Sequence, residues 1–148
     1  ISNFSEYYKL VKYLTRYTKK QLGLTMGVTN LIEIFDEKYY DGVKGGILEA
    51  FGNIFKNNMK IYLYPVLDKQ KGNVIDSTNL KLEDNMKEFY KYFKVNDKIR
   101  DLEFNKDYLN IFSKDVLKQI KNNTPGWEDK LPEGVSDLII KKKMFGYK

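Results

Sequence analysis

The sequence predicts an α+β fold, mainly α, with about five or six helices around a small central antiparallel β-hairpin or sheet. Two observations support this fold class. Apolar residues recur at three- and four-residue spacings through most of the chain, as on one face of a helix. Only near residues 61–75 do β-favouring residues instead flank a turn rich in Asp, Lys and Gly. A length of 148 residues, with no repeat and no linker-like segment, predicts a single compact domain over 1–148.

Three helices are predicted in the N-terminal third. Residues 4–22 place an apolar stripe on one helical face, and Gly23 is a typical end signal. Residues 27–41 predict a second, shorter helix, and residues 47–55 a third. The glycines between 42 and 46 separate these two helices.

The β element is predicted where the period changes. Residues 61–64 read Ile-Tyr-Leu-Tyr, and an apolar run resumes at residues 74–75 after a polar turn. This pattern predicts a β-hairpin in which Pro65 lies at an edge position or a bulge, because proline cannot donate to a ladder of hydrogen bonds.

Helices return in the second half of the chain. Residues 82–93 predict one helix, and residues 105–123 predict one or two. Residues 98–104 between them fit either a short third strand or a connector. A loop over 124–132 contains two prolines, and a last helix is predicted from Pro132 to about Gly146.

The residue inventory excludes most familiar catalytic chemistry. The chain has no Cys and no His, so it lacks a thiol nucleophile, an imidazole base and the usual transition-metal ligands. We therefore assign no catalytic residue and expect no metal and no cofactor. An enzyme that uses Lys or carboxylate groups is the least favoured reading, since it requires a strongly perturbed pKa inside a pocket.

A glycine-rich stretch at residues 44–58 raises the question of a phosphate-binding loop. It follows a predicted helix rather than a strand, and no Lys-Ser or Lys-Thr follows its last glycine. We predict that Gly45 and Gly46 form a turn and that Gly52 allows close approach of a neighbouring element.

The charge of the chain is strongly basic. The net charge is +6, and 24 of the 26 basic residues are lysine. Such a balance can mark a polyanion partner, although lysine lacks the planar fork with which arginine recognises phosphate. An RNA- or nucleotide-associated domain is therefore an alternative, with exposed Tyr62 and Tyr64 and a lysine set of Lys60, Lys69, Lys71, Lys141, Lys142 and Lys143. The strand pattern alone favours the other interpretation of Tyr62 and Tyr64, in which they cover the helices on the inner face of a half-buried hairpin.

The leading hypothesis is a non-catalytic interaction domain or an accessory subunit of a larger protein assembly. Aromatic residues make up 15% of the chain, and large aromatic side chains are common anchors at protein interfaces. The candidate anchors are Trp127, Phe145, Tyr147, Tyr62 and Tyr64. Trp127 fits an interface anchor and a side chain that closes the core equally well.

The sequence also bears on the compartment. No apolar run approaches the ~20 residues that a membrane helix needs, and polar residues interrupt the opening stretch. The first residue is Ile, so we expect a fragment, a processed product or part of a longer chain. An intracellular location is predicted, either cytoplasmic or organellar after removal of a presequence.

Overall fold

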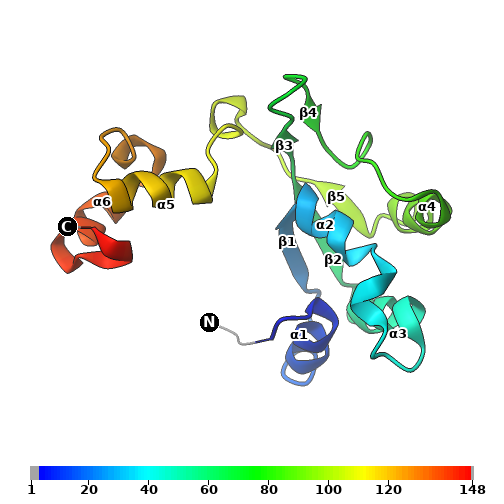
Figure 1. The fold of residues 1–148 in the computed structure, drawn as a ribbon. Coiled ribbons are helices and arrows are strands. Elements are labelled where there is room, and N and C mark those ends of the chain that lie inside the picture. The colour runs from blue at the N-terminus through cyan, green and yellow to red at the C-terminus, as the bar shows by residue number, and fades with distance from the viewer. Residues whose placement is uncertain (1–3, 148) are drawn as a thin grey trace. The chain divides into compact units, whose positions relative to one another are not determined.

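A computed structural model describes residues 4–147 and confirms the predicted fold class, α+β and mainly α. The described residues contain six α-helices and five strands (Figure 1). The chain divides between Glu103 and Phe104 into two compact units, called here unit 1 and unit 2, and each is described by itself. The single domain inferred from chain length stays a prediction.

Unit 1 is built on a three-stranded parallel sheet. Its strands are β1 (Gly23–Gly27), β2 (Lys60–Tyr64) and β5 (Ile99–Asp101), in the order β1-β2-β5. Leu24 lies beside Ile61, and Ile61 beside Ile99. Parallel neighbours need a crossover between them. Helices α2 (Val28–Ile34) and α3 (Gly46–Ile54) connect β1 to β2, and α4 (Lys87–Val95) connects β2 to β5.

An antiparallel hairpin is present, but it is not the central sheet, and its first strand is not the predicted residues 61–64. Strands β3 (Val66–Leu67) and β4 (Val74–Ile75) pair in antiparallel register directly beyond Pro65. The sequence pattern correctly located this turn. It did not show that residues 61–64 pair with two distant strands instead, because those pairings are not local.

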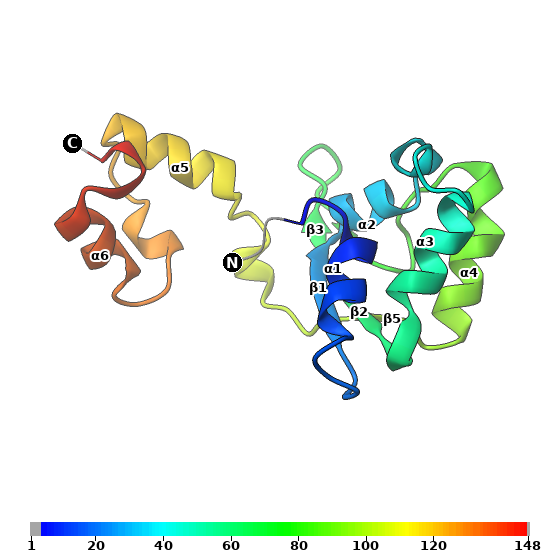
Figure 2. The same cartoon turned by 90° about the horizontal axis from the view of Figure 1, so that it is seen from below.

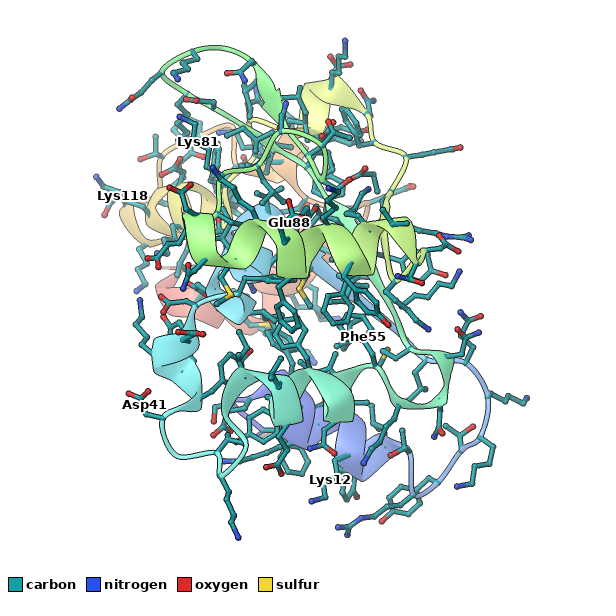
Figure 3. The ribbon with its side chains drawn as sticks, turned by 90° about the vertical axis from the view of Figure 1, so that its right-hand side faces the viewer. Lys12, Asp41, Phe55, Lys81, Glu88 and Lys118 are labelled. Carbon is teal, nitrogen blue, oxygen red and sulfur yellow. The ribbon has the colours of Figure 1, made fainter. Side chains whose placement is uncertain are left out.

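All the buried apolar residues that the structure describes in unit 1 form one core against one face of the sheet. Ile61 and Leu63 are fully buried, as is Val11 of α1 (Tyr7–Leu14). Figure 2 shows α3 and α4 on one side of the strands, and Figure 3 looks onto these two helices. Phe51 of α3 contacts Phe93 of α4 with ring centroids 5.1 Å apart. We call the sheet face under these helices the inner face.

Several predicted elements differ in extent from the observed ones. The helix predicted over 4–22 is helical only over Tyr7–Leu14, and Gly23 begins a strand rather than ending a helix. The ambiguous stretch at 98–104 contains strand β5. The described residues also form short 3₁₀ helices: η1 (Glu37–Tyr40), η2 (Lys56–Asn58), η3 (Asp84–Met86), η4 (Lys106–Tyr108), η5 (Glu128–Lys130) and η6 (Met144–Gly146).

Unit 2 is a small helical unit with its own core. Helices α5 (Ser113–Asn122) and α6 (Val135–Lys142) supply Val116, Ile120 and Ile139, which are buried together with Trp127. The last helix begins at Val135, after Gly134 with φ of 77°, and not at Pro132 as predicted. A left-handed backbone conformation at position 134 suits glycine, and it separates the turn at Pro132 from the helix.

Candidate binding surfaces

The glycine-rich stretch at 44–58 is not arranged as a phosphate-binding loop. The Glu49 carboxylate accepts a hydrogen bond from the Gly45 backbone N–H at 2.9 Å, so the helix end is capped by its own side chain. Gly46 has a φ of +58°, which explains a glycine at this turn. Gly52 is exposed, and nothing lies within 4 Å of the position of an added Cβ, so the predicted close approach is wrong.

A cavity of about 600 Å³ lies beside this turn. Glu37, Asp41 and Lys44 line it together with apolar side chains such as Phe89. Two carboxylates in the wall disfavour an anionic ligand, which agrees with the capped helix end.

A polar network near the end of β5 was missed by the sequence reasoning. Ser77 is 3% exposed, and its hydroxyl donates to the Asp101 carboxylate and accepts from Lys94 Nζ at 2.5 Å. The Tyr90 hydroxyl donates to the Ser77 carbonyl at 2.7 Å. Burial raises the pKa of Tyr90 well above its usual range.

This network ties the loop after β4 to α4 and β5, and its polar atoms satisfy one another. Among the described residues, no buried side-chain nitrogen or oxygen lacks a partner. The serine is covered, and its hydroxyl is engaged on both sides, so we interpret the group as structural. No signal in the sequence marked it, because its members are up to 24 residues apart.

The outer face of the parallel sheet is the first candidate surface. Residues of β2 alternate, so that Lys60, Tyr62 and Tyr64 are partly exposed and Ile61 and Leu63 are buried. Arg100 of β5 lies in register beside Tyr62, and Thr25 of β1 lies on its other side; both are exposed. The predicted tyrosines therefore lie opposite the core. An inner-face role for them, covering the helices, is not what the structure shows.

One carboxylate connects the two cations of this face. Asp97 Oδ2 lies 2.5 Å from Lys60 Nζ, and Asp97 Oδ1 accepts from Arg100 Nε at 2.5 Å. Asp97 occupies a left-handed turn with φ of 56°, between α4 and β5. Hydrogen bonds from Arg100, and then from Lys60, hold the pKa of Asp97 well below its usual range.

In unit 2, the aromatic candidates have different environments. Trp127 is 1% exposed and lies in the core, where its ring contacts that of Tyr147 with centroids 5.9 Å apart. Of the two readings left open for Trp127, the structure supports the core side chain. Tyr147 is partly buried against the same cluster.

Phe145 is instead presented to solvent. Its side chain is 54% exposed, while its neighbours Met144 and Tyr147 pack against the unit 2 core. Its backbone has φ of 58° and ψ of 21°, a left-handed conformation that is rare for a bulky residue. The backbone of η6 therefore holds Phe145 outward between two attached neighbours.

The predicted lysine set is divided between the two units. Lys60 lies on the outer face of the sheet, and Lys69 and Lys71 lie in the turn between β3 and β4. Lys141, Lys142 and Lys143 are exposed at the end of α6, and only Met144 separates them from Phe145 in the sequence. Gly146 lies beside the Lys121 side chain of α5, whose Cγ would be 3.6 Å from an added Cβ. Lys121, which was not among the predicted lysines, thus lies beside the residue that follows Phe145.

The described residues contain no group of three or more acidic side chains placed to hold a metal ion. None of the helices in this part of the chain is long and apolar enough to cross a membrane. Comparisons with protein-family models, with curated proteins and with solved structures found no match.

Proposed function

We propose that this chain is a non-catalytic interaction domain of a larger assembly, and that it holds a protein partner through Phe145 and the lysines around it. We further propose that the assembly is intracellular, as the cysteine-free composition suggests. The observation that carries the proposal is the exposed, left-handed Phe145 between two side chains that pack inward.

A left-handed conformation costs a non-glycine residue roughly 1–2 kcal/mol. Such conformations persist where the surrounding structure determines them, and they cluster at active sites, ligand clamps and switch regions. A phenylalanine that gains little burial from its own unit fits an anchor for another molecule, because buried aromatic side chains dominate interface energies.

The surrounding charges indicate the chemistry of the partner. Lys121, Lys141, Lys142 and Lys143 make no ion pair with another described residue. An acidic surface with an apolar recess for Phe145 would complement them. These lysines would mainly accelerate association, and the aromatic anchor would mainly slow dissociation.

Phe145→Gly tests this proposal without damage to the fold. Glycine adopts the left-handed conformation freely, so we expect unit 2 to keep or gain stability, by up to about 1 kcal/mol. We expect a partner affinity lower by about 30-fold, as for an interface hot spot. The native mass of the tagged protein from the cells that produce it, at low and high salt, identifies the complex. Calorimetry with the purified partner then measures the affinity.

Tyr108→Ala is the matched control, because Tyr108 is an aromatic residue of unit 2 with a similar exposure of 59%. The complex should survive this change. A Phe145→Gly variant that keeps its full partner affinity would contradict the anchor role. The absence of any protein partner in the native complex, at low and at high salt, would contradict the protein partner itself.

A further inference from the structure

We propose that the outer face of the unit 1 sheet is a stacking surface for single-stranded nucleic acid. The inference goes beyond the proposed protein-binding function and concerns different residues in a different unit. It rests on which side of the sheet is covered, on the residue types of the other side, and on how its charges are paired.

The described residues of unit 1 cover its parallel sheet on one face only. Parallel sheets in proteins normally have both faces covered by other elements. The core of unit 1 includes Ile61, Leu63 and Ile99 of the inner face, whereas Tyr62, Tyr64 and Thr25 do not belong to it. Figure 2 shows α3 and α4 on the same side of the strands. Among the described residues of unit 1, no helix packs onto the outer face.

The outer face is unsuited to a docked helix. Sheet faces that pack against helices are rich in Val, Ile and Leu. Within the bounds of the three strands, the outer face has no Val, Ile or Leu, and consists of Gly23, Thr25, Gly27, Lys60, Tyr62, Tyr64 and Arg100. Aromatic and basic side chains on a strand are instead typical of surfaces that bind unpaired bases.

The spacing and the surroundings of Tyr62 and Tyr64 suit the stacking of unpaired bases. Tyr62 and Tyr64 are two residues apart on the central strand, so their side chains emerge about 7 Å apart on one face. The Tyr62 ring lies over Gly23, where an added Cβ would be only 2.7 Å from its Cε2. This contact supports the ring from the side of β1, while Arg100 stands in register on the other side. Each tyrosine can thus accept one base, with a cation beside the first.

Asp97 pairs with both cations of the outer face, Lys60 and Arg100. A phosphate group can take its place, since it offers oxygens to the same guanidinium and ammonium groups. Asp97 would then weaken binding by competing for both cations. Its removal should strengthen binding, which a purely structural ion pair does not predict.

The test uses fluorescence anisotropy of the full chain with a short labelled oligouridylate, between about 50 and 200 mM salt. We expect affinity to fall with salt. Tyr62→Leu and Tyr64→Leu should each weaken binding by about 5- to 150-fold, the range for the loss of one stacked base. Asp97→Asn should strengthen it about fivefold at the lower salt, because a nearby negative charge is removed.

Tyr92→Leu is the matched control, because Tyr92 is a 61% exposed tyrosine of α4 on the helical side of unit 1. It should leave the affinity unchanged. An oligodeoxythymidylate and a DNA duplex distinguish the ligand classes: single strands should bind and the duplex should not compete. Absence of binding at low salt, equal binding of the duplex, or weaker binding by Asp97→Asn would overturn the proposal. Loss of a protein partner in Tyr62→Leu, without any nucleic-acid binding, would assign this face to protein docking instead.

Discussion

Two aromatic residues near the end of the chain show how much depends on the environment of a single side chain. Trp127 and Phe145 are both large, and the sequence proposed both as partner anchors. The structure buries Trp127 in the unit 2 core and leaves Phe145 more than half exposed. Only Phe145 is therefore available as an anchor without unfolding part of the chain.

Trp127→Ala should destabilise the fold of unit 2. Replacing a buried tryptophan by alanine typically costs 3–5 kcal/mol, because it removes apolar burial and leaves a cavity. Far-UV circular dichroism during denaturation should show a transition at lower denaturant concentration. A Trp127→Ala variant that keeps wild-type stability would show that this side chain does not hold the unit 2 core together.

At the scale of secondary structure, the elements with strong local patterns were predicted best. The apolar stripe of residues 47–55 predicts α3 to within one residue at each end. Strand β1 was missed because its sequence, Gly-Leu-Thr-Met-Gly, has little β preference of its own. Its pairing with β2, more than thirty residues away, supplies the hydrogen bonds that make it a strand.

The candidate surfaces were predictable to a similar degree. Alternation along β2 correctly placed Lys60, Tyr62 and Tyr64 on one face. Arg100 and Asp97 could not be assigned to that face, because their positions follow from the parallel pairing of β5 with β2. The exposed setting of Phe145 follows from a left-handed backbone that local residue patterns do not reveal.

The alternation of β2 predicts opposite effects at neighbouring positions. Leu63→Ala should lower the free energy of unfolding by about 2–5 kcal/mol, since Leu63 is fully buried in the core of unit 1. Tyr62→Leu, one residue earlier on the outer face, should cost less than about 1 kcal/mol. Urea denaturation of both variants measures the difference. Equal costs at the two positions would contradict the assignment of inner and outer faces.

At the scale of the whole molecule, the division at Glu103 raises the question of how cooperatively the chain unfolds. The core of unit 2 has four buried apolar residues, and the chain has no cysteine to form a disulfide. Units of this size seldom stand alone without a disulfide, a metal or a partner.

The single tryptophan makes this question measurable, because Trp127 reports on unit 2 alone. If residues 1–148 form one cooperative domain, as the chain length predicts, the fluorescence and circular dichroism transitions should coincide. We expect coincidence. A tryptophan transition at clearly lower denaturant concentration would show that unit 2 unfolds independently.

The strand order β1-β2-β5 leaves β1 and β5 at the two edges of the sheet. The two edge strands differ in the residues that discourage pairing with a strand of another chain. Strand β5 carries Arg100 and Asp101, and charged residues on an edge strand discourage another chain from adding to it. Strand β1 has no charged residue, and only its terminal glycines and its short length weaken it as a template. Of the two edges of this sheet, β1 is therefore the one at which we expect self-association through strand addition to begin.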